Sequence, residues 1–267
     1  MLAGTLETMR MKTQSTLLFF LVFSILVSCT DQNDDKDICI IKIPSDTYIF
    51  PMTPYSSEWS NLDQEEIWEI NQLPYSIIES ISTEGLLETC ITFPYYGDIG
   101  LFDYHQNAFD YFISNFNGIY ELINRDNSSN IIFERYQSMH PSCVNNNYPD
   151  FLGRGESVGM SFVSIEMILA QYSVLSRFES YQLKVLAKEA LSKHDQKMSN
   201  ESTNTIFNLK FTLVICGRIL EVENYQPFIT ELNNNIELEQ FINQVFVGDV
   251  ESLEIIKINT MNYIETQ

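Results

Sequence analysis

The sequence has few of the residues from which catalytic and cofactor sites are usually built. It contains three histidines and ten glycines in 267 residues, and no G-x-G-x-x-G loop for a dinucleotide. It has neither a C-x-x-C pair nor an H-E-x-x-H run, which excludes a zinc knuckle, a thioredoxin-like site and a zincin site. His105, His140 and His194 stand alone in the chain. We therefore expect no cofactor and no metal site.

Basic residues are scarce as well. The chain has 15 lysines and arginines against 36 aspartates and glutamates, a formal net charge of −21 at pH 7. Such a chain repels phosphate backbones, so we expect no nucleic-acid partner. The charge suits a basic protein partner, or it is only a soluble coat without a partner, and we favour the coat.

The N-terminus carries a short apolar run. Residues 17–27 are almost entirely apolar. They are too few for a spanning helix of about 20 residues, but they have the length of a signal-peptide core. The sequence LVSC at positions 26–29 then has the form of a lipobox, in which the cysteine is acylated and becomes the new N-terminus. We predict that residues 1–28 are a lipoprotein signal peptide, with Met11 as an alternative start, and that Cys29 carries the lipid. The alternative is an ordinary secretory signal with a cysteine near the cut.

An acidic segment follows Cys29. Residues 30–37 include four aspartates and no apolar side chain, which is typical of a solvated tether. We expect the lipid on Cys29 to hold the protein in the cell envelope, at the outer membrane, facing the periplasm or the cell surface. The segment also opens like an EF-hand calcium loop, but Lys36 and Lys42 stand where that loop needs glycine and glutamate, so this form is excluded.

The rest of the chain is predicted to be an extended arm followed by one helical domain. Residues 29–55 form the tether and arm, because the prolines in this stretch exclude a long helix, although a short edge strand at 38–43 is compatible with the sequence. From there to residue 267 apolar residues recur at helical spacing. We predict an all-α fold with antiparallel helix pairs in a compact α/α array or bundle, and a domain over 56–267. The expected helices are 62–73, 83–92, 104–115, 118–124, 128–139, 158–172, one after 179, 203–222, 238–247 and 250–264.

Local signals mark several helix starts. Ser82 is expected to be an N-cap, and Asp103 with Gln106 and Ser176 with Glu179 have capping-box spacing. The helix after residue 179 should turn three lysines toward solvent, Lys184, Lys188 and Lys193.

Four cysteines besides Cys29 allow three disulfide pairings in an exported protein: Cys39, Cys90, Cys143 and Cys216. Cys90 and Cys216 lie in apolar helical patterns, where a buried free thiol explains them at least as well as a disulfide does.

Four segments carry a resemblance to a known group: Glu58-Trp59 with EEIWEINQLP, STEGLLETCITFPYYGDI at 82–99, FNGIYELINRDN at 116–127 and EMILAQYSVLSRF at 166–178. Together they resemble a set of uncharacterised lipoproteins of Bacteroidetes. The resemblance spans most of the mature chain and implies a helical, exported protein. That group has no assigned activity, so the resemblance implies no catalytic residue.

The clearest enzyme-like pattern is GESVG at 155–159, which matches the G-x-S-x-G elbow of α/β-hydrolases. The elbow needs a β-strand before it, whereas PDFLGR precedes this one, and His194 is the only later histidine. A helix start capped by Ser157 explains the segment without a sheet. We favour the helix start and keep a serine hydrolase using Ser157 as the alternative.

Two weaker patterns have ordinary structural explanations. His140 and Cys143 have the types of a Cys–His pair, but they lie in a Pro/Asn-rich loop with nothing to orient them. Glu65 and Glu69 share a helix face, as a glycosidase pair does, but a solvated face is the common meaning.

The aromatic stretch 93–112 is the remaining candidate for binding. Tyr95, Tyr96 and Tyr104 are candidates for rings that stack on a sugar or anchor a protein partner. The alternative, which we favour, is that this stretch is aromatic core.

These observations predict a lipid-anchored envelope protein that acts as a binding or scaffolding module and is not an enzyme. The alternatives are an acidic immunity or inhibitor lipoprotein against a basic toxin or hydrolase, and the serine hydrolase.

Overall fold

The computed structural model describes residues 39–40, 42–54, 56–144, 158–201, 203, 205–246 and 248–266. This part of the chain is helical and contains no β-strand, so the predicted all-α fold is confirmed. Residues 41–267 form one compact unit, which is described by itself below. Cys29 and Ser157, which the sequence singled out, lie outside the described residues.

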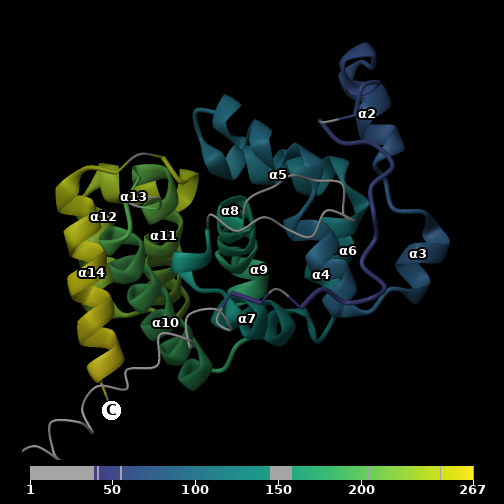
Figure 1. Cartoon of the computed structure of the whole chain (residues 1–267). Helices are drawn as coiled ribbons and strands as arrows, with labels where there is room; N and C mark the ends of the chain where they lie inside the picture. The colour runs from purple at the N-terminus through teal and green to yellow at the C-terminus, as the bar shows by residue number, and fades with distance from the viewer. Residues whose placement is uncertain are drawn as a thin grey trace, which may run out of the picture. The chain divides into compact units, whose positions relative to one another are not determined.

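Most of the helices are short, and turns connect them (Figure 1). They are the 3-10 helices η2 (Trp59–Asn61), η3 (Pro94–Leu101) and η4 (Pro141–Cys143), and the α-helices α2 (Gln64–Ile70), α3 (Tyr75–Ser80), α4 (Thr83–Ile91), α5 (His105–Asn115), α6 (Asn117–Asn124), α7 (Ser128–Ser138), α8 (Val158–Leu169), α9 (Tyr172–Leu175), α10 (Ser180–Ser199), α11 (Ile206–Val222), α12 (Gln226–Asn234), α13 (Ile236–Gln244) and α14 (Val250–Glu265).

The described part of the arm, residues 42–54, is extended and lies against α4. The Asp46 carboxylate accepts a hydrogen bond from the Ser82 amide at 2.7 Å, and the Tyr48 amide donates to Thr89 Oγ1 at 2.9 Å. Phe50 is buried and meets Phe93 edge-on, with ring centroids 5.5 Å apart. These contacts make the arm part of the folded unit, and no strand forms among its described residues.

Aromatic rings fill the interior between α2, η3, α5 and α6. Trp68 stacks on Tyr95 with centroids 4.3 Å apart and an interplanar angle of 2°. Phe93 stacks on Phe116 at 4.1 Å, and Tyr96 meets Phe112 edge-on at 5.4 Å. We call the ring cluster built around these residues the aromatic core. Stacked and edge-on pairs of this kind add to the free energy gained from burial alone.

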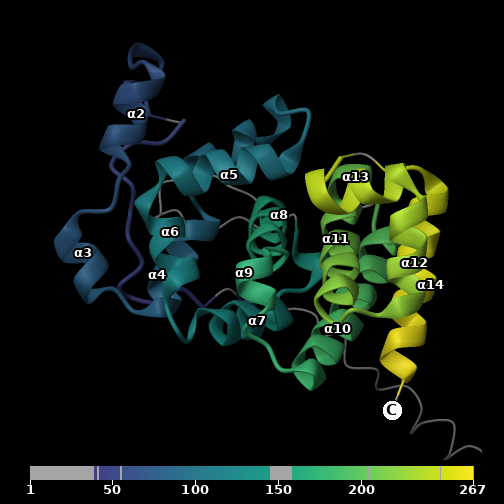
Figure 2. The same ribbon diagram turned by 180° about the vertical axis from the view of Figure 1, so that it is seen from behind.

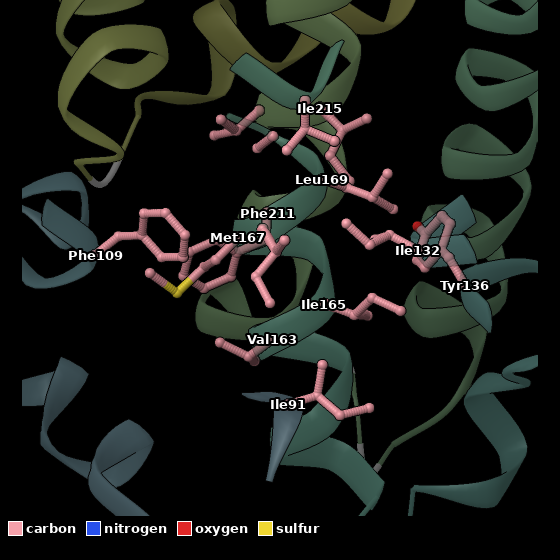
Figure 3. Packing of buried hydrophobic residues seen from close by; sticks show 14 of the residues in the cluster. Ile91, Phe109, Ile132, Tyr136, Val163, Ile165, Met167, Leu169, Phe211 and Ile215 are labelled. Atoms are coloured by element: carbon pink, nitrogen blue, oxygen red, sulfur yellow. The ribbon is translucent and has the colours of Figure 1, made fainter. Parts of the chain in front are cut away.

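Helix α8 is the central element that its apolar sequence predicts. Its side chains are buried from Ser161 to Leu169, and they contact α4, α7 and α11. Figure 3 shows the side chains of α8 projecting in several directions among those of neighbouring helices; the labelled residues are Val163, Ile165, Met167 and Leu169 of α8 with Ile91, Phe109, Ile132, Tyr136, Phe211 and Ile215.

Helices α10, α11 and α14 pack side by side, with α12 and α13 beside them, as Figure 2 shows from behind. The sequence prediction missed α12, and it missed α3 as well. Both have a proline near their start: Pro74 is the N-cap of α3, and α12, which begins at Gln226, has a proline in its first turn. Proline ends a preceding helix but suits a first turn, so these prolines mark starts as well as stops.

Arg218 of α11 joins the ends of three other helices. Its guanidinium donates to the carbonyl of Ile242 at 3.0 and 2.8 Å, to the carbonyl of Ala170 at 3.1 Å and to Gln106 Oε1 at 2.8 Å. The group also lies 5.1 Å from the ring centre of Tyr172. Arg218 is 1% exposed, so these contacts replace its hydration.

The helix caps confirm one of the caps predicted from the sequence and contradict two others. Ser82 caps α4 by accepting from the Gly85 amide at 3.0 Å, as predicted. The Asp103 capping box was wrong, because α5 starts at His105 without a side-chain cap. The capping box of α10 starts at Glu179, three residues after the predicted Ser176.

Lys193 was expected in solvent and is buried instead. Its Nζ donates to the Met139 carbonyl at 2.5 Å and forms an ion pair with Glu189 at 2.9 Å.

Candidate functional site

A cavity of about 310 Å³ lies between α10, α11 and α14. This volume is at the lower end of the range of small-ligand pockets, about 300–1,000 Å³. Its walls are mostly aliphatic, from Met198, Leu209, Leu213, Val250 and Leu253, with four ionisable residues among them, His194, Lys210, Glu254 and Lys257. We call it the α10–α11–α14 cavity.

The cavity lies where one helix ends and two begin. Met198 is in the last turn of α10, Leu209 in the first turns of α11, and Val250 opens α14. The two starts are fixed by local caps: Thr205 Oγ1 accepts from the Asn208 amide, and Asp249 accepts from the Ser252 amide at 2.7 Å. Caps of this kind satisfy amides that a helix start leaves unbonded, so the walls are held by regular structure rather than by loops.

The cavity runs from an exposed apolar rim to a buried polar end. Met198 and Val250 are 46% and 77% exposed at the rim. Lys210 and His194 are 2% and 4% exposed and line the interior. Little of the amine or the imidazole is therefore accessible from the cavity.

Lys210 faces a histidine from another part of the chain. Its Nζ lies 2.7 Å from Nδ1 of His105, and that nitrogen also lies 3.1 Å from the carbonyl oxygen of Val245. Burial lowers the pKa of Lys210 to about 8. Burial also lowers the pKa of His105, and the positive charge of Lys210 lowers it further. At pH 7 the pair is therefore an ammonium beside a neutral imidazole.

His194 is neutral for a similar reason. Burial lowers its pKa to about 4, and the charge of Lys257 is the next cause that lowers it. Its Nδ1 lies 3.1 Å from Thr212 Oγ1, and Lys257 itself is 3.5 Å from Asp195. Lys210 and Lys257 bring positive charge to a lining that also includes the carboxylate of Glu254.

A buried ionic network includes Lys197, which directly precedes the cavity residue Met198 in the sequence. Lys197 Nζ donates to both carboxylate oxygens of Glu166 at 2.7 Å and to the Asn208 carbonyl at 3.1 Å. The Tyr136 hydroxyl donates to the same carboxylate at 3.0 Å. Glu166 and Lys197 are 0% and 1% exposed. Burial raises the pKa of Glu166 and lowers that of Lys197, although each is paired with the other.

The tyrosines proposed for binding lie in different surroundings. Tyr95 and Tyr96 are 5% and 3% exposed within the aromatic core, so the hypothesis that they are exposed anchors is wrong. Their rings are covered because the neighbouring helices supply more rings to stack on them. Tyr104 is 38% exposed, and its ring lies 5.5 Å from that of Phe246.

The cysteines are divided between two states. Cys39 and Cys143 are disulfide-bonded, whereas Cys90 and Cys216 are free and buried, as their apolar surroundings suggested. A disulfide-bonded sulfur is no nucleophile, so the weak Cys–His pattern at Cys143 is excluded. His140 instead lies 2.7 Å from the Ser142 hydroxyl.

The glutamate pattern on α2 also has a structural explanation. Glu66 accepts from the Asp63 amide at 3.0 Å as half of a capping box, and Glu65 and Glu69 are exposed. An α/β-hydrolase elbow at residues 155–159 would need a sheet, and the described ranges contain no strand.

Comparisons with protein-family models, with curated proteins and with solved structures find no match for this chain. Within the described part of the chain, no group of three or more His, Cys, Asp or Glu side chains is placed to hold a metal ion. Among the helices of that same part, none has both the length and the apolar character to cross a membrane.

Sequence reasoning missed the residues of the cavity. One signal for them was present: Lys210 and Arg218 are basic residues in the largely apolar segment 206–220, and both are buried. A charge within a helix that is apolar on most faces needs a specific partner or a functional reason.

Proposed function

We propose that the protein is a lipid-anchored envelope protein that binds a small, mostly apolar ligand in the α10–α11–α14 cavity. The cavity carries the proposal, because a mostly aliphatic hollow of about 310 Å³ with a few convergent polar groups is the usual form of a small-ligand site. The LVSC sequence at 26–29 supports the anchor. Binding rather than catalysis is proposed because most of the wall consists of Met, Leu and Val, which supply contact area and no reactive group.

The binding half is tested by filling the cavity. Leu253 lines the cavity and is only partly buried, so Leu253→Trp places a larger ring there without entering the core. Ile258→Trp, on the same helix at a position that is 54% exposed and does not line the cavity, is the matched control. Binding of the neutral dye Nile red is followed by fluorescence, and circular dichroism shows that both variants are folded. We expect the wild type and the Ile258 variant to bind equally and the Leu253 variant to bind at least tenfold more weakly, about 1.4 kcal/mol. Equal binding by all three proteins would contradict the assignment.

The anchoring half is tested separately. Cys29→Ala should release the protein from the membrane fraction and abolish labelling with a palmitate analogue, because acyl chains on this residue provide the anchor. An unchanged membrane fraction would show that the anchor lies elsewhere, whatever the cavity binds.

A basic protein partner, as for an inhibitor or immunity protein, is favoured by the net charge of −21. Electrostatic steering would then make association rates fall with salt, because the Debye length shrinks from about 10 Å at 0.1 M to about 3 Å at 1 M. Partner capture by the Leu253→Trp variant distinguishes this function from the first, since a protein bound to the acidic surface is retained when the cavity is filled.

A further inference from the structure

A second pocket, of about 320 Å³, lies next to the aromatic core, and its lining includes Pro54, Trp59, Pro94, Tyr95 and Asp98. We call it the Trp59–Asp98 pocket. We infer that it binds an arginine side chain of a partner protein, whose guanidinium contacts the Trp59 ring and pairs with the Asp98 carboxylate. The inference goes beyond the proposed function, because this pocket shares no lining residue with the α10–α11–α14 cavity.

The local structure of η3 places Asp98 beside Tyr95. The Tyr95 ring is fixed by stacking on Trp68, with centroids 4.3 Å apart. Residues three apart lie on the same face of a 3-10 helix, so Asp98 follows Tyr95 on the face of η3 that lines the pocket. Burial raises the pKa of the Tyr95 hydroxyl, and the negative charge of Asp98 raises it further, which agrees with this placement. The position of the carboxylate is therefore set by the aromatic core.

Trp59 supplies the accessible ring of the pocket. It is half-buried, whereas Tyr95 is 5% exposed. The centroids of the two rings lie 5.5 Å apart, with an interplanar angle of 50°. Tyr95 therefore supports the Trp59 ring and is not itself a contact surface. The two prolines have no backbone N–H group, so they offer apolar surface to the methylene groups of an entering side chain.

The Asp98 carboxylate is half-buried and has no cation beside it. Among the residues that the structure describes, none donates a hydrogen bond to its side chain or forms an ion pair with it. Burial raises its pKa, and no positive charge of the chain acts against this rise. A carboxylate that has lost water in this way is stabilised in its ionised form by a cation that a ligand brings.

The sequence around the pocket contains no basic side chain that could act as this cation. No lysine or arginine occurs between Lys42 and Arg125, and all described residues that line the pocket come from this stretch. Exposed carboxylates stand near the pocket residues in the sequence, at Glu58, Asp63 and Glu65. The local charge therefore attracts a cation from outside the stretch, and no basic side chain of the stretch competes with it.

A ring and a carboxylate in one pocket favour a guanidinium over other cations. A guanidinium is planar, stacks on the face of an aromatic ring and presents two N–H groups to a carboxylate. It is also more weakly hydrated than an ammonium, so its transfer into a half-buried pocket costs less. A partner protein is the source that we propose, because arginine is enriched in protein interfaces and among the residues that contribute most to binding.

The experiment follows the indole N–H signal of Trp59 by NMR while ligands are added. The chain has two tryptophans, so Trp59→Leu identifies the signal by its loss. The ligands are the N-acetyl amides of arginine, lysine and citrulline, which represent residues within a polypeptide. Citrulline has the shape of arginine without its charge. Salt at about 0.15 M screens exposed charges that lie farther away than about 8 Å. We expect saturable shifts, with arginine bound at least about fivefold more tightly than citrulline.

Two variants assign this preference to the pocket. Asp98→Asn keeps the shape of the side chain and removes its charge, so it should abolish the preference for arginine over citrulline. Glu65→Gln makes the matching change at an exposed position of α2 that does not line the pocket, and it should keep the preference. If circular dichroism shows that Asp98→Asn does not fold, the comparison of the three ligands on the wild type still decides.

Every other outcome counts against the inference. Equal binding of arginine and citrulline would overturn it, and so would a preference that Asp98→Asn retains. Tighter binding of lysine than of arginine would show that the pocket takes an ammonium and not a guanidinium. Shifts that do not saturate would show that the cations only gather at the acidic surface. None of these results affects binding of Nile red in the α10–α11–α14 cavity, so the proposed function is tested separately.

Discussion

The aromatic core and the helices around the cavity fill their interiors in different ways. Between α2 and α6 the interior is made of stacked and edge-on rings such as Trp68 on Tyr95. Between α8 and α14 it contains buried ionic side chains, Glu166, Lys193, His194, Lys197, Lys210 and Arg218, and a cavity.

Rings and buried charges have different energetic consequences. Ring packing stabilises a fold by burial and by the geometry of ring pairs. Buried ionic groups lose their hydration and are weak sources of stability even when they are paired. Side chains with strongly shifted pKa values next to a cavity therefore support the binding site that we propose there. The comparison teaches that the rings of the segment 93–112, which looked most like a binding surface in the sequence, mainly fill the interior of their half of the unit.

The largest effect should come from breaking the buried ion pair in the charged half. Lys197→Met leaves the Glu166 carboxylate with the Tyr136 hydroxyl as its remaining hydrogen-bond donor among the contacts described, and should cost about 3–5 kcal/mol of unfolding free energy. Urea unfolding measures the loss. Adding Glu166→Gln, which removes the unpaired charge but still accepts from Tyr136, should recover most of it. A single variant that is as stable as the wild type would mean that the pair is not buried as described.

The next effect is a loss of stability in acid that belongs to His194. Its pKa is lowered from 6.5 to about 4 in the folded protein, so the unfolded chain takes up a proton first as the pH falls. The contribution of His194 is present above pH 6.5 and is lost between pH 6.5 and about pH 4, and it should amount to about 3 kcal/mol.

Unfolding measured across this range for the wild type and for His194→Gln isolates the effect. Glutamine can keep a hydrogen bond to Thr212 but does not titrate, so its curve should be flatter in acid. If the unfolding free energies of the two proteins vary with pH in the same way, the pKa of His194 is not lowered in the folded protein.

A smaller effect is expected from the aromatic core. Phe93→Leu keeps an apolar side chain but loses the ring contacts with Phe116 at 4.1 Å and Trp68 at 5.3 Å, and should cost about 1–2 kcal/mol. A double-mutant cycle with Phe116→Leu should give a coupling of about 0.5–1.5 kcal/mol. Strict additivity of the two changes would show that ring geometry contributes nothing here.

The smallest single effect is expected at Tyr96, and the same substitution in the charged half provides the contrast. The Tyr96 hydroxyl is buried and has no hydrogen-bond partner among the residues that the structure describes, so Tyr96→Phe should leave stability unchanged or raise it by up to about 1 kcal/mol. The Tyr136 hydroxyl donates to Glu166, so Tyr136→Phe should cost about 1.5–3 kcal/mol. Thermal unfolding of both variants measures the contrast, and equal changes would remove the distinction between the halves.

The sequence predicted what depends on local structure. Helical spacing and proline positions gave the all-α fold and most of the helices, and Ser82 was identifiable because its hydroxyl bonds an amide three residues away. The prediction of a capping box at Asp103 was wrong because spacing alone does not decide it. The Gln106 side chain instead accepts a hydrogen bond from Arg218, 112 residues further along the chain. The prediction that Lys193 is exposed was wrong because its Nζ donates to the carbonyl of Met139, which lies 54 residues earlier in the chain.

The cavity could not be predicted for a related reason. It is made where Met198, Leu209 and Val250 meet, at the ends of three helices that are separate in the sequence. Periodicity shows which face of a helix is apolar, but not whether three such faces leave a space when they pack. The sequence signal for this cavity was a charged residue, Lys210, within a largely apolar helix.

Arg218 has a consequence for the order in which the protein folds. Its partners Ile242, Ala170 and Gln106 lie 24, 48 and 112 residues away along the chain. Closing such long loops costs chain entropy, so we expect these contacts to form after local helices and neighbouring pairs have docked. Interactions that are absent from the transition state act mainly on the rate of unfolding. Replacement of Arg218 should therefore leave the refolding rate nearly unchanged and shorten the lifetime of the native state, which sets how long the fold survives when cleavage of the opened chain is faster than its refolding.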